Sequence, residues 1–343
     1  MEFGRFGSRL AGGSGMERLK QFIEAWNGPE DYIEAHTSGS TGTPKAIRLL
    51  KSDMKVSAFA TNRFFGINEK SVVGMALSAD YIAGKMMTVR SLLSGARLVA
   101  IPPQTDVCLD SVDYVIDLFA IVPAQIQSLI DKPEYAAKVR NLLIGGAAPT
   151  AEQCHALTLL GYKAYISYGM TETCSHVALA RADDSRRVFH AMPGITFACE
   201  GPQSRLVIEC PNFSAKRIVT NDVVEVLSPE KFRWRGRADN IINSGGIKLI
   251  PEELETMYAP FTGNVEYYVT SFAHDKWGRA VALVAATDCK RLEAIAEKLC
   301  ANIAEHKYLP KRLIAVKNLP KAGNGKIRRL DADSEELLEL AQL

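Results

Sequence analysis

Short apolar runs alternate with segments of helical periodicity in the middle of the chain, and this alternation constrains the fold more than any other feature. The apolar runs, each short enough for a buried strand, lie at residues 119–123, 141–144 and 164–167. Helical patterns through Ile130 and over residues 151–160 separate them. Strands that alternate with helices predict an α/β sheet whose loops carry ligands at the strand ends.

The pattern changes in the second half of the chain. Short strand-like runs separated by Pro, Asn and Ser lie at residues 205–209, 223–226 and 232–234. A smaller α+β pattern follows, with helices over 251–257 and 291–305 and strands near 265–269 and 280–286. Because 343 residues with 47% hydrophobic content exceed one typical domain, we expect two domains divided near residues 236–239.

Composition limits the cellular setting and the partners. The first fifteen residues are rich in Gly, Ser and Arg, which predicts a tag and linker before Met16; a natural disordered arm is the alternative. Seven cysteines without a C-x-x-C pair, and without a signal-peptide pattern, predict a reducing cytoplasm. A net charge of +2 and no apolar run of roughly 18 residues predict neither a nucleic-acid nor a membrane partner.

A loop rich in hydroxyl groups and glycine lies between strand-like runs at residues 32–35 and 47–49. It contains Thr37, Ser38, Gly39, Ser40, Thr41, Gly42, Thr43, Pro44 and Lys45. Glycines let backbone N–H groups approach phosphate oxygens, hydroxyls donate to them, and lysine adds charge. The spacing is not that of a Walker A loop. Strands on both sides favour a phosphate-binding loop over a flexible linker.

A carboxylate beside hydroxyl groups follows the strand predicted at residues 164–167. The segment contains Tyr168, Gly169, Met170, Thr171, Glu172 and Thr173. Oxygen ligands of this kind suit Mg²⁺, and the aromatic ring can pack on a base. Taken alone, a turn with a solvated glutamate explains the segment equally simply.

Two basic, glycine-containing segments follow, at residues 234–248 and 319–329. In the second, Gly323 and Gly325 flank Asn324 in a tight turn that projects Lys326. Each segment by itself is typical of a solvated surface loop.

Together and in this order, the four segments resemble the signature motifs of the adenylate-forming superfamily, which includes acyl-CoA synthetases, luciferases and peptide-synthetase adenylation domains. The resemblance extends from about Tyr32 to Arg329. It implies a large ATP- and acyl-binding domain over 16–236, with α/β layers and a β-rich segment, and a small mobile α+β domain over 237–343. It also implies that ATP converts a carboxylate into an acyl-adenylate, from which a thiol displaces AMP.

The resemblance gives each matching residue an expected role. The nucleotide would contact Thr37, Ser38, Gly39, Ser40, Thr41, Gly42, Thr43, Lys45, Gly146, Ala147, Ala148, Tyr168, Gly169, Asp222 and Arg237. Asp222 would bind the ribose hydroxyls and Glu172 would bind Mg²⁺. Thr171 would lie near the α-phosphate, and Lys326 would be the catalytic lysine of the first step. The hinge would be Asp239, and CoA would contact Gly245 and Gly246.

Within the superfamily, the sequence is most similar to the o-succinylbenzoate–CoA ligases of menaquinone biosynthesis. The similar segments lie at residues 82–90, 119–125, 145–149 and 171–175. The implied acid has two carboxylates, so the one that does not react needs a cation or donors in the acyl pocket. The candidates are Lys85 and Arg90 on an apolar helix over residues 82–93, with Thr173 and Ser175 as hydroxyl donors.

The two cations need not share this role. Either one can instead extend to solvent along its aliphatic stem. Five residues separate Lys85 from Arg90, which places them about 140° apart on a regular helix, so at most one is expected to point at the ligand.

Two departures from the superfamily stand out. Little sequence precedes Tyr32, and residues 77–81 (LSADY) replace the usual Pro-Leu-Phe-His segment. Alternative functions are a CoA ligase for another aryl or acyl acid, an enzyme that loads a carrier-protein thiol, and a catalytically silent nucleotide-binding or scaffolding homologue. The presence of Lys326, Glu172 and Asp222 together favours an active ligase.

Overall fold

The computed structural model describes residues 14–36, 46–321 and 327–341. The chain divides into two compact units, and in the β-rich region it passes from one unit to the other several times. The first comprises Met1–Ala198, Val207–Val219 and Val226–Arg233, and the second comprises Cys199–Leu206, Thr220–Glu225 and Trp234–Leu343. Four strands contribute residues to both units: β10 (Thr196–Glu200), β11 (Arg205–Glu209), β12 (Arg217–Ser228) and β13 (Lys231–Arg237).

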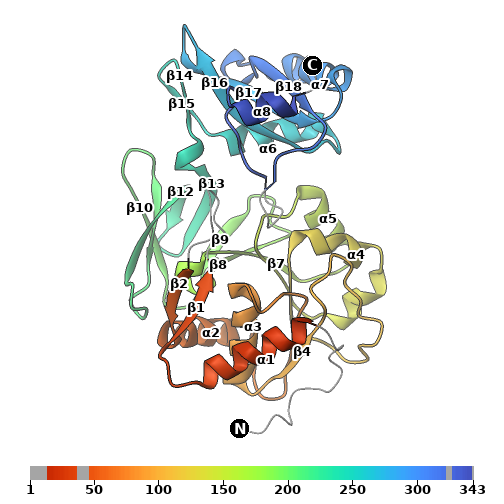
Figure 1. Cartoon of the computed structure of the whole chain (residues 1–343), viewed down its shortest axis with the longest axis vertical. Helices are drawn as coiled ribbons and strands as arrows, with labels where there is room; N and C mark the ends of the chain where they lie inside the picture. Colours follow the sequence, from red (N-terminus) through yellow and green to blue (C-terminus); the bar gives the residue numbers. More distant parts are fainter. Residues whose placement is uncertain (1–13, 37–45, 322–326, 342–343) are drawn as a thin grey trace. The chain divides into compact units, whose positions relative to one another are not determined.

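A mostly parallel sheet forms the centre of the first unit (Figure 1). Its parallel strands are β3 (Val72–Met75), β4 (Arg97–Ala100), β5 (Leu118–Ile121), β6 (Leu142–Ile144) and β7 (Ala164–Gly169), in the order β4-β3-β5-β6-β7. Antiparallel strands β8 (His176–Arg181), β9 (Val188–Ala191) and β13 (Lys231–Arg237) continue the sheet beyond β7. The predicted α/β sheet is therefore confirmed, with strand ends within two residues of those expected.

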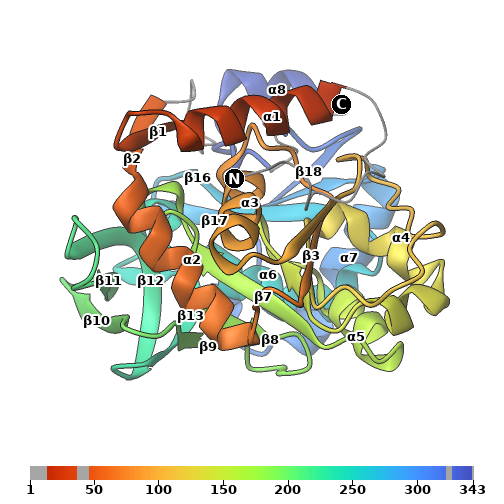
Figure 2. The same cartoon turned by 90° about the horizontal axis from the view of Figure 1, so that it is seen from below.

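Helices precede or connect the parallel strands. The main ones are α2 (Lys51–Phe65), α3 (Ile82–Ser94), α4 (Ile126–Ile130) and α5 (Ala151–Leu159). In Figure 2, α2 and α3 lie on one side of β3, while α4 and α5 lie on the other. A capping box starts α5, because the Thr150 hydroxyl accepts from the Gln153 N–H and the Gln153 side chain accepts from the Thr150 N–H.

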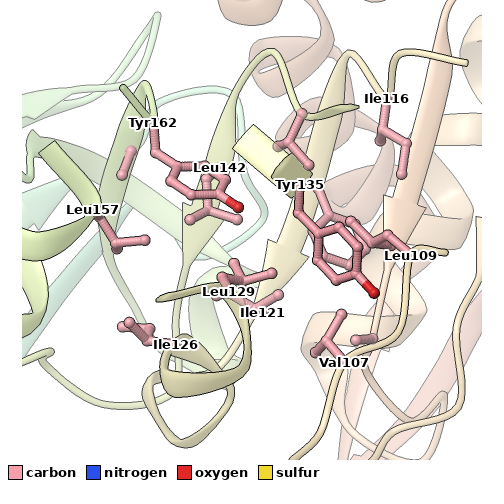
Figure 3. Close-up of a cluster of buried hydrophobic side chains, with 14 of the residues drawn as sticks. Val107, Leu109, Ile116, Ile121, Ile126, Leu129, Tyr135, Leu142, Leu157 and Tyr162 are labelled. Carbon is pink, nitrogen blue, oxygen red and sulfur yellow. The ribbon is translucent and has the colours of Figure 1, made fainter. Parts of the chain in front are cut away.

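A large apolar cluster fixes this side of the sheet (Figure 3). Ile121 and Leu142 from the strands pack with Leu129 of α4 and Leu157 of α5, all with almost no exposed surface. Each such side chain contributes roughly 1.5–3 kcal/mol by leaving water. The cluster thereby holds the strands β5 and β6, and one predicted ligand-binding loop, at residues 145–149, follows β6.

The first unit also contains an N-terminal helix and a hairpin. The helix is α1 (Ser14–Asn27), and the hairpin pairs β1 (Tyr32–His36) with β2 (Ala46–Leu50) in antiparallel register from Tyr32↔Leu50 to His36↔Ala46. The strands expected at 32–35 and 47–49 are thus confirmed. They flank the loop that was predicted to bind phosphate.

The second unit has the expected α+β composition. Its sheet has the order β15-β14-β17-β16, with β18 parallel to β17. These strands are β14 (Ile242–Ser244), β15 (Ile247–Leu249), β16 (Tyr267–His274), β17 (Gly278–Ala286) and β18 (Arg312–Val316). The helices are α6 (Pro251–Thr262), α7 (Cys289–Asn302) and α8 (Glu335–Leu340). Leu254 and Leu299 from two of these helices pack with Leu283 of the sheet.

None of the helices within the described residues is both long and apolar enough to cross a bilayer.

Candidate active site

Two of the predicted ligand-binding segments leave the same edge of the parallel sheet. Ile144 pairs with Ile166, so the segment after β6 and the end of β7 lie side by side. Gly146 has φ = +83°, which favours glycine, and the three residues Gly146, Ala147 and Ala148 are exposed. The carboxyl edge of a parallel sheet is where α/β proteins bind ligands, and here it presents backbone groups without bulky side chains.

Arg187 fixes the end of this loop. Its guanidinium donates to the carbonyl oxygen of Pro149 over 2.6 Å. Arg187 itself has φ = +46° in a turn in which its N–H donates to the Asp184 carbonyl over 3.0 Å. The sequence analysis did not identify this residue, because an arginine in a turn carries no local signal of such a contact.

Tyr168 is held by aromatic neighbours at the end of β7. Its ring centroid lies 5.0 Å from that of Phe232 and 5.7 Å from that of Phe189, both in edge-on geometry. The residue as a whole is half-buried. Edge-on packing of this kind fixes the plane of a ring, which is what a base-stacking surface requires.

A bulge and a tight turn follow Tyr168. The register of β7 with β8 shifts between Tyr168 and Gly169, and a Cβ added at Gly169 would lie 2.1 Å from the Ser175 carbonyl oxygen. Thr173 is fully buried, and its hydroxyl contacts three main-chain groups: the Met170 N–H at 3.0 Å and the carbonyls of Met170 and Ser175 at 3.0 and 2.7 Å. Thr173 thus shapes the turn that leaves Thr171 half-buried and Glu172 exposed.

Glu172 fits a metal ion that arrives with a nucleotide. No group of three or more His, Cys, Asp or Glu side chains suited to a metal occurs within residues 14–36, 46–321 and 327–341. Mg²⁺ commonly uses one or two carboxylates together with substrate phosphates. A single exposed carboxylate at the sheet edge matches that pattern.

Arg90 is the most deeply buried charged residue among those that the structure describes in the first unit. It is 1% exposed, and its Nη2 atom donates to the Ser175 hydroxyl over 2.6 Å. Burial lowers the pKa of Arg90 to about 9, which still leaves it charged at neutral pH. None of the ion pairs among the described residues includes Arg90. A buried cation without an anionic partner is costly, so the arrangement favours an anion from a ligand.

Lys85 lies in different surroundings. Its ammonium donates to the Ala79 carbonyl over 2.7 Å and lies 5.2 Å from the Phe22 ring centroid. Burial lowers the pKa of Lys85, and the negative charge of Asp80 partly offsets this. Lys85 lines a cavity of about 450 Å³ together with residues of α1 and the β1 region. The structure therefore brings Arg90 to Ser175 and places Lys85 elsewhere, as expected from their separation on the helix.

In the second unit, the predicted ribose and hinge residues form one polar network. The buried carboxylate of Asp222 accepts from the Trp234 indole over 3.1 Å, and Arg237 Nη1 lies 3.7 Å from the same oxygen. Arg237 also donates to Asp239 over 3.1 Å, and Asn221 donates to the same Asp239 oxygen over 3.2 Å. Arg237 thereby links Asp222 to Asp239. The part that Trp234 plays was not predicted from the sequence.

Gly245 and Gly246 form the exposed turn between β14 and β15. Their φ angles are +59° and +84°, so both positions favour glycine. The Gly245 N–H donates to the Trp277 carbonyl over 2.9 Å, and a Cβ there would approach the Trp277 ring to 3.3 Å. The backbone of this turn therefore packs against the Trp277 side chain.

The remaining predicted residues, in the phosphate loop and the lysine turn, lie outside the described residues: Thr37, Ser38, Gly39, Ser40, Thr41, Gly42, Thr43, Lys45 and Lys326. The structure describes what flanks them. His36 pairs with Ala46 in the hairpin of β1 and β2. Lys321 and Ile327, which lie before and after the lysine turn, form an isolated antiparallel β-bridge. Arg329, just beyond, forms ion pairs with Glu255 and Glu252.

Comparison with known proteins gives a family match and relatives that have named activities. A family model described as AMP-binding enzyme matches residues 14–202. The 2-succinylbenzoate–CoA ligase of Staphylococcus epidermidis is 25% identical over 331 residues, which cover 88% of this chain and 69% of the relative. The enzyme of the same name from Listeria monocytogenes is 25% identical over 336 residues, covering 90% and 70%.

Solved structures share the fold. An acyl-CoA synthetase (AMP-forming)/AMP-acid ligase II-like protein from Dyadobacter fermentans superposes with a TM-score of 0.61 at 27% identity, covering 95% of this chain and 94% of that protein. The O-succinylbenzoate coenzyme A synthetase from Bacillus subtilis, solved with AMP, has a TM-score of 0.75 at 20% identity, covering 90% and 70%.

Proposed function

The chain belongs to the AMP-binding enzyme family, and from this premise we propose that it is an ATP-dependent ligase that joins o-succinylbenzoate to CoA. The relatives from two bacterial genera carry that activity in their names and align with most of this chain. The thioester would serve menaquinone biosynthesis.

The proposed reaction has two steps. In the first, an oxygen of the succinyl carboxylate attacks the α-phosphorus of ATP, and pyrophosphate leaves. In the second, the CoA sulfur attacks the acyl carbon, and AMP leaves. Negative charge accumulates in the first step, so Lys326 and the loop from Thr37 to Lys45 would stabilise it, with Thr171 near the α-phosphate. A Mg²⁺ ion held by Glu172 would add positive charge on the phosphates.

The nucleotide would lie along the carboxyl edge of the sheet. Gly146, Ala147 and Ala148 would offer backbone groups to the base, and Tyr168, next to Gly169, would stack on it. The open backbone at that edge supports this placement.

In the second unit, Asp222 would accept the ribose hydroxyls, with Arg237 beside it. We place the boundary between the two domains near residue 237 and the hinge at Asp239, and we assign Gly245 and Gly246 to CoA. The Asp222–Arg237–Asp239 network supports coupling between the ribose site and the hinge.

One observation carries the choice of acid: Arg90 is a fully buried cation whose side-chain contacts are neutral groups. A second carboxylate on the substrate would supply the missing negative charge, and Ser175 would lie beside it. A simple fatty or benzoic acid has no group to do this. A cytoplasmic location is part of the proposal, since the seven cysteines carry free thiols.

The test is pyrophosphate release and thioester formation with a panel of acids, each with ATP, Mg²⁺ and CoA. We expect o-succinylbenzoate to be the best substrate, benzoylpropionate, which lacks the ring carboxylate, to be poor, and benzoate to be inert. A preference for a monocarboxylic acid would overturn the choice of substrate and leave the ligase chemistry standing. No pyrophosphate release with any acid would favour the catalytically silent alternative.

A further inference from the structure

His176 lies at the start of β8, and every polar atom of its ring faces another polar group. The side chain is buried, and its Nε2 atom lies 3.1 Å from the hydroxyl of Thr61 on α2. The Thr61 hydroxyl also lies 3.1 Å from the carbonyl oxygen of Ser57, to which it donates. Neither contact was suggested by the sequence.

The second contact decides which ring nitrogen of His176 carries the proton. A carbonyl oxygen can only accept, so the single hydroxyl proton of Thr61 is directed to Ser57. The Thr61 oxygen must therefore accept from His176, which makes Nε2 the protonated nitrogen. The remaining nitrogen, Nδ1, then carries a lone pair. Burial and the charge of Arg90 lower the pKa of His176 well below its ordinary value, which keeps the ring neutral.

The lone pair of Nδ1 faces the group proposed to bind the second carboxylate. The Ser175 hydroxyl lies 3.3 Å from Nδ1, and Nη2 of Arg90 lies 3.5 Å from it. Because a guanidinium can only donate, Ser175 accepts from Arg90 over 2.6 Å and gives its own proton to Nδ1. The result is a chain of hydrogen bonds with a single direction, from Arg90 through Ser175, His176 and Thr61 to the main chain.

We propose that His176 is a positioning residue that holds Arg90 for the second carboxylate of a dicarboxylic substrate. The inference rests on the proposed function. The chemistry explains why the support is neutral: an aspartate here would hold Arg90 equally well but would neutralise it. A neutral acceptor fixes the guanidinium and leaves its full charge for the ligand. His176 would then determine selectivity for dianionic over monoanionic acids.

A competing explanation is that His176 merely fills the core. The experiment separates the two by comparing kcat/KM for o-succinylbenzoate with kcat/KM for benzoylpropionate in each variant. The His176→Leu variant removes both ring nitrogens, and His176→Gln restores a neutral acceptor and donor. Thr61→Val removes the hydroxyl that fixes the tautomer.

Thr88→Val is the matched control. Thr88 is also a buried helical threonine, and its hydroxyl donates to the carbonyl four residues earlier, Gly84, over 3.0 Å, as Thr61 does to Ser57. Among the residues that the structure describes, no histidine bonds the Thr88 hydroxyl. The two threonine variants therefore make the same chemical change in the same kind of site.

We expect the preference for the dicarboxylate to fall at least about tenfold in His176→Leu, which removes both hydrogen bonds of the ring and its contact with the Arg90 guanidinium. We expect a fall of about three- to tenfold in Thr61→Val, which removes one hydrogen bond between neutral groups. The preference should stay within about threefold of wild type in His176→Gln and Thr88→Val. If His176→Leu weakens both acids equally, or if Thr88→Val matches Thr61→Val, the inference fails while the proposed function stands. A wild-type chain that does not convert o-succinylbenzoate overturns both.

Nitrogen NMR of histidine-labelled protein gives a readout that does not depend on activity. The chain has six histidines, and the signals lost in His176→Gln identify those of His176. We expect a neutral ring protonated on Nε2 at about pH 7, and a change of tautomer in Thr61→Val but not in Thr88→Val. A wild-type ring protonated on Nδ1 contradicts the inference.

Discussion

The indole nitrogen of Trp234 donates a hydrogen bond to the Oδ1 atom of Asp222 over 3.1 Å. This bond fixes the plane of a buried carboxylate that is proposed to accept the ribose hydroxyls of ATP. Arg237 lies 3.7 Å from the same oxygen and also bonds Asp239, so one side chain connects the ribose site to the proposed hinge.

Asp222→Ala should raise the KM for ATP by at least about tenfold, because hydrogen bonds to a charged group contribute roughly 1.5–3 kcal/mol each. Trp234→Phe keeps the carboxylate and removes only its orienting donor, so we expect a smaller increase of about threefold. Steady-state kinetics at saturating acid and CoA measure both. An ATP KM that changes less than about threefold in Asp222→Ala would contradict the ribose assignment.

Lys326→Ala should abolish adenylate formation and leave the reaction of a supplied acyl-adenylate with CoA largely intact. The reason is that charge on the α-phosphate develops only in the first step. Lys321→Ala is the matched control, because Lys321 starts the same segment and pairs with Glu266 at 2.9 Å instead. Each half-reaction is assayed separately. Equal loss of both steps in Lys326→Ala would point to a role in folding or general nucleotide binding.

Asp239→Pro should impair thioester formation more than adenylate formation, since proline fixes φ near −65° and restricts rotation at a hinge. The substitution also removes the carboxylate that accepts from Arg237 and Asn221. Asp239→Ala serves as the control, because it loses the same hydrogen bonds and keeps the backbone freedom. Only the proline variant should therefore lose more of the rate of thioester formation than of the rate of adenylate formation. If the two variants behave identically, Asp239 is not the hinge.

Arg90→Met should raise the KM for o-succinylbenzoate at least about tenfold, with the ATP KM near wild type, because methionine keeps the buried stem and removes the charge. Lys85→Met makes the same kind of change on the same helix. Its ammonium instead contacts the Ala79 carbonyl, away from Ser175, so we expect an effect below about threefold. Thermal unfolding of both variants checks that they remain folded. If neither variant affects the acid KM, the second-carboxylate site lies elsewhere.

Acid should destabilise the folded chain partly through His176. Its pKa is well below 6.5 when folded, because of burial and the Arg90 charge, and returns to about that value on unfolding. The unfolded chain therefore binds a proton that the folded chain does not, and stability falls by about 1.4 kcal/mol per pH unit below 6.5. Urea unfolding at about pH 7.5 and about pH 5.5 measures this loss. It should be smaller in His176→Gln, and an equal loss would show that His176 is not responsible.

Part of the order of strands and helices followed from the sequence alone. Apolar runs such as 119–123 and 141–144 are signals that depend only on neighbouring residues, and β5 and β6 appear within two residues of them. The glycine-rich and basic motifs are equally local. For that reason the family and the general chemistry were predictable before any coordinates.

Contacts between distant residues were decided only by the tertiary structure. The sequence could not choose between Lys85 and Arg90, because the helix face that turns inward depends on how α3 packs. In the structure, this packing brings Arg90 into hydrogen-bond contact with Ser175, 85 residues away in the chain. The links between Trp234 and Asp222 and between Thr61 and His176 are of the same kind. A hydrogen bond depends on distances of about 3 Å and on direction, and these arise only when separate elements pack together.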